Sequence, residues 1–123
     1  MNPQDLQYSK EHEWLRVAGD IGTVGITDHA QSELGDVIFV DFPQVGAKVE
    51  AGKTLGTIES VKAVSEIFSP VSGEILEVNK NLLTAPEAVN SDPHSSWMVV
   101  LKLSDPAETG TLLDVTQYSD LVK

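Results

Sequence analysis

Short runs of hydrophobic and β-branched residues alternate with turn-forming residues along most of the chain, up to about residue 103. Glycine, proline, aspartate and asparagine separate these runs at close intervals, which is typical of many short strands rather than of long helices. The pattern predicts a mainly β chain with strands at His12–Val17, Ile21–Ile26, Val37–Phe42, Thr54–Ser60, Ala63–Phe68, Gly73–Val78 and Trp97–Leu103. The Gly19-Asp20 pair is expected to close the first hairpin.

Helical signals interrupt the strand pattern at two places. The first predicted helix is Thr27–Leu34, with Thr27 or Asp28 as its N-terminal cap and Gly35 as its stop. The second helical segment follows residue 103, where Ser104-Asp105-Pro106 is a start signal, and Gly110 is expected to split it.

Residues 79–96 form the longest predicted connection between two strands. They contain turn-forming residues throughout, with one helical turn expected to start at Pro86. Long connections of this kind often carry function. No low-complexity tract or proline-rich linker marks a domain boundary, so residues 1–123 are interpreted as one domain.

The net charge of the chain restricts the classes of partner that it is expected to bind. Eight Lys and Arg residues stand against 19 Asp and Glu residues, which gives a net charge of -11. No basic run offsets this imbalance, so neither nucleic acid nor an anionic membrane is an expected partner. The acidity fits docking on basic partner surfaces, and it fits equally a simple role in solubility.

Cysteine is absent, which excludes disulfides, thiolate zinc sites and cysteine nucleophiles. The first ten residues lack the patterns of a signal or transit peptide, and no apolar stretch reaches 18 residues. These features favour a cytoplasmic protein of bacterial type, although a mature mitochondrial protein would have the same features.

Motifs of catalysis and metal binding are missing as well. The three histidines, His12, His29 and His94, have no zinc-ligand spacing, and there is no G-x-S-x-G motif. Gly52-Lys53-Thr54 ends like a phosphate-binding loop, but Ala47 stands where that motif needs glycine and a strand follows instead of a helix. The chain is therefore predicted to have no catalytic residue and no metal site, and not to be an enzyme.

One lysine has a distinctive setting. Two strand-like arms flank Lys62, and a turn lies outside each arm, so folding the arms as a hairpin places Lys62 at an exposed tip. The tip has no Asn-Gly or Asp-Gly pair, which leaves its turn type open. A hairpin tip combines access with a rigid support, and a lysine amine can attack an activated acyl group. An exposed lysine is ordinarily a solvated charge, so only this setting makes Lys62 a candidate modification site.

The residues around Lys62 resemble the biotinyl and lipoyl carrier domains. Biotin carriers typically present Met-Lys-Met, whereas Val61-Lys62-Ala63 is similar to the lipoyl branch. Between Leu6 and Tyr118 the chain resembles the H-protein family of the glycine cleavage system, through the motifs YSKEHEW, VGITDHAQ, LGDVIFV, ESVKA, SPVSGE and LSDP. The resemblance implies a flattened β-barrel or sandwich hybrid of two pseudo-symmetric halves, with a short internal helix and a C-terminal helical tail.

This resemblance also implies a function. Lipoate attached to Lys62, which Glu59, Ser60, Val61 and Ala63 flank, would accept an aminomethyl group from the pyridoxal-phosphate-dependent glycine decarboxylase, the P protein. The aminomethyltransferase, or T protein, would pass the one-carbon unit to tetrahydrofolate and release ammonia. Dihydrolipoamide dehydrogenase, the L protein, would reoxidise the dithiol with NAD. A lipoate ligase or octanoyltransferase would attach the group, and the carrier itself is expected to be a non-catalytic monomer.

Members of this family fold the loaded arm into a surface cleft. Glu13 and Glu66 stand where the family often has acidic cleft residues, and a carboxylate can pair with an ammonium group. Glu33 departs from the histidine of some members, which leaves the rest of the lining open. Both Glu13 and Glu66 could instead be ordinary solvated residues.

Other functions compete with glycine cleavage. The chain could be a lipoyl carrier for sulfur metabolism, or a relay that supplies lipoate to 2-oxoacid dehydrogenases. A hydrolase or binding module on a β-sandwich would need a convergent polar pocket that the sequence does not indicate.

The remaining motif residues are predicted to be structural. Gly46, Gly52 and Gly73 are expected to need unusual backbone angles, and Trp14, Phe39 and Trp97 are expected in the core. His12 and His29 are interpreted as hydrogen-bonded framework residues without a chemical role.

Overall fold

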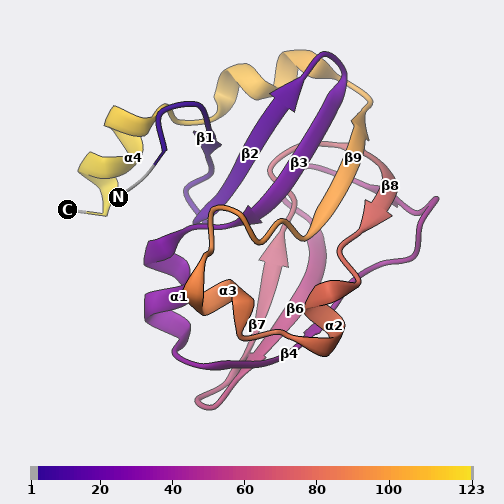
Figure 1. Cartoon of the computed structure of the whole chain (residues 1–123). Helices are drawn as coiled ribbons and strands as arrows, with labels where there is room; N and C mark the ends of the chain where they lie inside the picture. Colours follow the sequence, from indigo (N-terminus) through magenta and orange to yellow (C-terminus); the bar gives the residue numbers. More distant parts are fainter. Residues whose placement is uncertain (1–2, 123) are drawn as a thin grey trace.

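The computed structural model describes residues 3–122, which form two antiparallel sheets with short helices at their edges (Figure 1). The larger sheet has the order β1-β2-β3-β9-β8-β5, and its strands are β1 Gln7–Tyr8, β2 Glu13–Ala18, β3 Ile21–Ile26, β9 Val99–Leu103, β8 Gly73–Val78 and β5 Lys48–Val49. The smaller sheet has the order β4-β6-β7, with β4 Val37–Asp41, β6 Thr54–Ser60 and β7 Val64–Phe68. The helices are α1 Asp28–Leu34, α2 Asn81–Thr84, α3 Ala88–Ser91, the 3-10 helix η1 Pro106–Thr111 and α4 Val115–Leu121.

One hydrophobic core joins the two sheets. Leu15 and Val24 of the larger sheet belong to the same buried cluster as Val40 and Ile58 of the smaller sheet. All four side chains are almost completely buried, as expected for residues packed between two sheets. The predicted mainly β, flattened sandwich is confirmed, although the sheets do not close into a barrel.

Most strand predictions agree with the structure. Three strands, Ile21–Ile26, Thr54–Ser60 and Gly73–Val78, have the predicted bounds, and the other four begin or end one or two residues away. The two-residue strands β1 and β5 were not predicted, because two residues carry no periodicity. The connection over 79–96 contains the expected helical turn as α3 and, in addition, α2.

Helix α1 starts and ends where its capping residues indicate. The Thr27 hydroxyl accepts a hydrogen bond from the Ala30 amide, and Gly35 follows the helix with φ of 78°. The C-terminal helical segment, however, does not divide at Gly110, which lies within η1. It divides before Asp114, because the Asp114 and Gln117 side chains form a capping box that starts α4.

Three expectations about side chains and glycines are wrong in part. Phe39 is 52% exposed, because a β-bulge between Val37 and Phe39 breaks the alternation of β4 and turns the ring to solvent. Trp97 is only partly buried, whereas Trp14 is fully buried as expected. Gly73 does not have a positive φ. A Cβ atom there would lie 2.4 Å from the Lys102 carbonyl oxygen, so glycine is required by the lack of space and not by the backbone angle.

The β6–β7 hairpin projects from one end of the molecule, away from α4 (Figure 1). Helix α1 lies beside this hairpin, so the hairpin and α1 together frame that end. Within the described residues, no helix is both long and apolar enough to cross a lipid bilayer.

Candidate functional site

Lys62 lies at the exposed tip of the β6–β7 hairpin, as predicted. The Ser60 amide donates to the Ala63 carbonyl at 2.8 Å and closes the turn around Val61 and Lys62. Neither central residue has a positive φ, since His12 is the one described non-glycine residue that does. This geometry excludes a type I′ turn and explains why the tip has no Asn-Gly signal.

The side chain of Ser60 holds this tip in place. Its hydroxyl oxygen accepts hydrogen bonds from the amides of Lys62 and Ala63, each at 3.2 Å, and its proton is donated to the Ala63 carbonyl at 3.2 Å. Ser60 is only 5% exposed. The backbone of Lys62 is therefore anchored, while its side chain remains exposed.

The hairpin tip is attached to the segment that follows α1. The Val61 amide donates to the Asp36 carbonyl at 3.0 Å, and Val37 pairs with Ser60 across β4 and β6. The Lys62 stem lies over Gly35, where a Cβ atom would be 3.2 Å from the Lys62 Cε atom. The start of the lysine arm is thus placed next to the end of α1.

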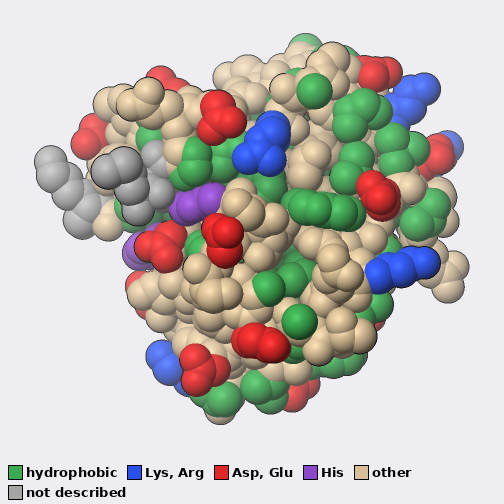
Figure 2. All heavy atoms as spheres, in the orientation of Figure 1, with side chains coloured by type: hydrophobic (Ala, Val, Ile, Leu, Met, Phe, Trp, Pro, Cys, Tyr) green, Lys and Arg blue, Asp and Glu red, His purple; other side chains and the backbone are tan. Residues whose placement is uncertain are grey.

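A cleft of about 210 Å³ opens between β2, α1 and the hairpin. It contains both predicted cleft acids, Glu13 and Glu66, together with Glu11, His12, Ile26, Ala30, Glu33, Leu34, Ile58, Ser65 and Ile67. The lining therefore combines apolar side chains with four carboxylates. In Figure 2, histidine side chains reach the surface near α1 with acidic side chains beside them. This composition suits an apolar chain that ends in a cation.

Lys62 and the cleft are adjacent in the structure. Leu34 lines the cleft, and the next residue, Gly35, contacts the Lys62 stem. Ile58 and Ser65, which face each other on the hairpin, also line the cleft. They lie two positions along the strands from Ser60 and Ala63, the pair that closes the tip. A flexible group attached to Lys62 thus starts at the border of the cleft.

Glu13 is the buried acid of the cleft, with only 3% of its surface exposed. The Ser9 hydroxyl donates to one of its carboxyl oxygens at 2.5 Å, and the Phe68 amide donates to the other at 3.3 Å. Burial raises the pKa of Glu13 to about 7, although these hydrogen bonds oppose the shift. A cation entering the cleft would favour the charged carboxylate and lower this pKa.

Glu66 has a different environment. It is exposed on β7, and its carboxylate accepts a hydrogen bond of 3.3 Å from the Thr54 hydroxyl. It lies opposite Thr57 on the neighbouring strand. Glu66 therefore contributes charge to the rim of the cleft, while Glu13 contributes a desolvated acceptor at its base.

His12 has a structural contact that the sequence could not indicate. Its Nδ1 atom lies 2.8 Å from the Tyr118 hydroxyl, which in turn lies 2.6 Å from the hydroxyl of Thr27, the cap of α1. Burial and the neighbouring His29 lower the pKa of His12, which favours its neutral form. The framework role predicted for His12 fits this network, which connects α4 to the helix beside the cleft.

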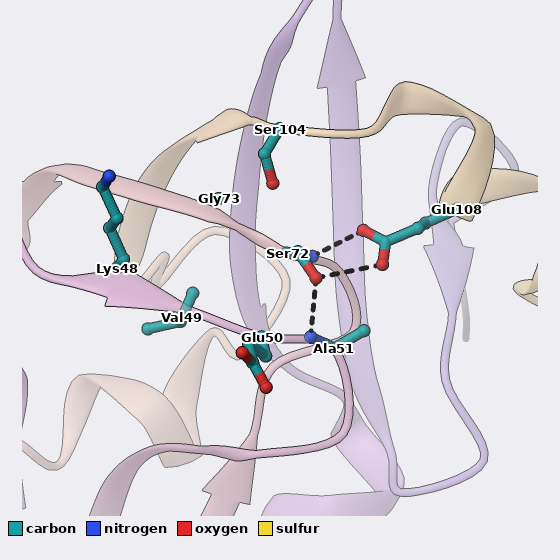
Figure 3. A pocket seen from close by; sticks show the side chains of 8 residues that line it. All are labelled: Lys48, Val49, Glu50, Ala51, Ser72, Gly73, Ser104 and Glu108. Carbon is teal, nitrogen blue, oxygen red and sulfur yellow. Dashed lines mark hydrogen bonds between the residues drawn. The ribbon is translucent and has the colours of Figure 1, made fainter.

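A second depression, of about 570 Å³, lies between β5, β8 and η1 (Figure 3). Some of its polar groups bond to one another: the Ser72 amide and hydroxyl both donate to Glu108, at 2.7 and 2.9 Å, and the Ala51 amide donates to the Ser72 hydroxyl. These bonds attach η1 to the sheet. Within residues 3–122, no group of three or more histidine and acidic side chains is arranged to hold a metal ion.

Several residues of the cleft region were not predicted from the sequence. Glu11, Ile26, Ile58 and Ile67 carry no recognisable signal, because ordinary strand residues acquire this role only when distant strands meet. Gly35 was predicted only as a helix stop. Its contact with the Lys62 stem depends on the packing of α1 against the hairpin.

Comparison with known proteins gives a consistent result. The family model described as "Glycine cleavage H-protein" matches residues 6–123. The chain is similar to proteins named "Glycine cleavage system H protein" from Acidobacterium capsulatum, with 51% identity over 98% of this chain and 94% of that protein, and from Rubrobacter xylanophilus, with 55% identity over 95% and 91%. It is also similar to the crystal structure of such a protein from Mycobacterium marinum, with a TM-score of 0.90, 36% identity and 97% of each chain covered.

Proposed function

The chain belongs to the glycine cleavage H-protein family and is a lipoyl carrier of that system, and we propose that Lys62 is the residue that carries the lipoyl group. The observation that carries this assignment is the position of Lys62. It is exposed at an anchored hairpin tip, and its stem lies at the border of a cleft lined by apolar side chains and four carboxylates.

Lys62 is suited to acylation by its surroundings. Its neutral amine would attack the carbonyl carbon of an activated acyl group and form an amide, while the activating group leaves and the amine proton passes to solvent. Ser60 keeps the tip backbone in one shape for the modifying enzyme, a lipoate ligase or octanoyltransferase. Glu59, Val61 and Ala63 are exposed around the lysine and form the surface that this enzyme would meet.

Bound to Lys62, lipoate would supply the disulfide and dithiol chemistry that carries an aminomethyl group, whose carbon then goes to tetrahydrofolate while its nitrogen leaves as ammonia. The chain's own contribution is to hold and shield the arm. The apolar residues Ile26, Ile58 and Ile67 would contact the hydrocarbon part of the arm, and burial there keeps water away.

Glu13 and Glu66 would bind the positive end of the loaded arm. An ion pair at Glu13 would form in a desolvated site, where charges interact more strongly than in water. Glu66 is exposed, so its attraction is weaker and is reduced by salt. Glu13 would therefore contribute most of the affinity and Glu66 a smaller, salt-dependent part.

We further propose that this chain has no catalytic residue. The three chemical steps would belong to glycine decarboxylase, aminomethyltransferase and dihydrolipoamide dehydrogenase, which visit the arm in turn. The names of the relatives favour glycine cleavage over sulfur metabolism or a lipoate relay. Those relatives are bacterial, which supports the cytoplasm as the place where the chain works.

Mass spectrometry of the protein from a host with working lipoylation tests the assignment. We expect a lipoyl mass increment on the Lys62 peptide, its loss in Lys62→Arg, and its retention in Lys53→Arg, a control at another exposed turn. The dehydrogenase should reduce the wild-type protein from this host, and it should not reduce Lys62→Arg. An unmodified Lys62, or biotin at that position, would refute the proposal.

A further inference from the structure

The side-chain amide of Asn90 connects α3 to three residues between the last turn of α1 and the start of β4. It lies on α3, within the connection 79–96. Its Oδ1 atom accepts from the Val37 amide at 2.8 Å, and its Nδ2 group donates to the Gly35 carbonyl at 2.8 Å and to the Gln31 side-chain oxygen at 3.0 Å. These partners lie 53 to 59 residues away in sequence.

Only an amide satisfies all three partners. The Val37 amide requires an acceptor, and the Gly35 carbonyl requires a donor, which together define the orientation of the Asn90 carboxamide. Aspartate would keep the acceptor but would present a carboxylate oxygen to the Gly35 carbonyl. Alanine would leave all three groups without this partner, and Asn90 is only partly exposed.

The segment that Asn90 clamps is the one that supports the hairpin tip. The Lys62 stem lies where a Cβ atom at Gly35 would contact it, the carbonyl of Asp36 accepts from the Val61 amide, and Val37 pairs with Ser60. Asn90 bonds to Gly35 and Val37 and so fixes the residue between them. A single side chain on α3 thereby controls the surface on which the lysine stem lies.

We propose that Asn90 is a positioning residue for the arm on Lys62. By holding residues 35–37 in shape, it keeps the stem of Lys62 on Gly35 and beside Leu34, so that the arm starts toward the cleft rather than into open solvent. The benefit for the loaded arm rests on the proposed function. The position of the Lys62 stem over Gly35 is a property of the unmodified chain, so it can be tested without lipoate.

The first test is nuclear magnetic resonance of the unmodified full chain. We expect cross-relaxation between the Lys62 side-chain methylenes and the Gly35 α-protons in the wild type. Asn90→Ala should reduce this signal several-fold, and Asn90→Asp should give an intermediate loss because it keeps the bond to the Val37 amide. If Asn90→Ala does not fold, the same signal is compared between the wild type and Asn90→Asp.

Ser96→Ala is the matched control. The Ser96 hydroxyl donates to the Ala88 carbonyl of the same short helix at 2.9 Å, so its removal loosens α3 without removing any bond to residues 31–37. We expect the Lys62–Gly35 signal to persist in Ser96→Ala. An unchanged signal in Asn90→Ala, or an equal loss in Ser96→Ala, would overturn the proposal.

A second test uses lipoylated protein loaded with its one-carbon group. Water cleaves the carbon–sulfur bond and gives formaldehyde, ammonia and the free thiol, so formaldehyde release reports how well the arm is shielded. Asn90→Ala should release formaldehyde about tenfold faster than the wild type, the effect expected from losing one or two such hydrogen bonds. Equal rates in both proteins would contradict the role. Absence of lipoyl on Lys62 would instead defeat the proposed function and leave the resonance test intact.

Discussion

The stem of Lys62 lies directly over Gly35: a Cβ atom at residue 35 would stand 3.2 Å from the Lys62 Cε atom and 3.8 Å from Nζ. The same glycine ends α1 with φ of 78° and ψ of -159°, a region of backbone space that is essentially limited to glycine. Gly35 therefore meets two separate demands, one from its own backbone and one from the lysine arm that crosses it.

Gly35→Ala should affect both stability and the arm. The backbone strain is expected to lower the free energy of unfolding by about 1–3 kcal/mol, measured by urea denaturation. The added methyl group should also displace the Lys62 stem and change the chemical shifts of its side chain. Gly46→Ala is the control, because Gly46 has φ of 93° but open space around it. It should lose stability while leaving Lys62 unchanged, and a Lys62 shift there would contradict the crowding argument.

Glu13 should make stability depend on pH. Its pKa is raised to about 7 in the folded chain from an ordinary 4.5, so the folded chain binds more protons than the unfolded chain between these values. The stabilisation from the protonated form is complete below pH 4.5 and is lost as pH rises through 7. The difference between the two pKa values corresponds to about 3 kcal/mol of unfolding free energy.

Comparison with Glu13→Gln isolates this contribution. His12 and His94, whose pKa values burial lowers, act in the opposite direction but are present in both proteins. The unfolding free energy of the wild type, relative to the variant, should fall by up to about 3 kcal/mol between pH 4.5 and 8. Parallel stability curves for the two proteins would show that Glu13 titrates normally.

Tyr118→Phe should weaken the connection between α4 and α1. The lost hydroxyl contacts His12 at 2.8 Å and Thr27 at 2.6 Å, so two groups lose a partner and unfolding should become easier by about 1–3 kcal/mol. Tyr8→Phe is the natural comparison, because within residues 3–122 the Tyr8 hydroxyl makes one bond, to the Pro3 carbonyl. Thermal denaturation should rank Tyr118→Phe as the less stable variant, and the reverse order would argue against the network.

Ser60→Ala should loosen the hairpin tip specifically. The Lys62 and Ala63 amides lose their acceptor, so their hydrogen exchange should accelerate by about tenfold while global stability falls by about 1 kcal/mol. Ser65→Ala, on the same hairpin, should leave both amides protected. Lipoylation of Ser60→Ala should also slow, because the modifying enzyme meets a mobile tip. Unchanged exchange at Lys62 would mean that the strands alone hold the turn.

The sequence by itself determined the features that depend on neighbouring residues. Short runs of apolar and β-branched residues indicated the β6–β7 arms, and turn residues outside them placed Lys62 at the tip. Thr27 and Gly35 marked the ends of α1 for the same reason, since a cap and its partner lie within one helical turn. The motif resemblance added Glu13 and Glu66, which the structure brings to one cleft.

Only the tertiary structure decided the properties that depend on residues far apart in the chain. The raised pKa of Glu13 comes from burial between elements, and the outward turn of Phe39 comes from a bulge in its pairing with β6. The clamp of Asn90 on residues 31–37 spans more than 50 residues of sequence. Local periodicity describes which face of a strand is buried, but not which distant backbone groups or carboxylates meet there, because packing of the whole core sets those distances.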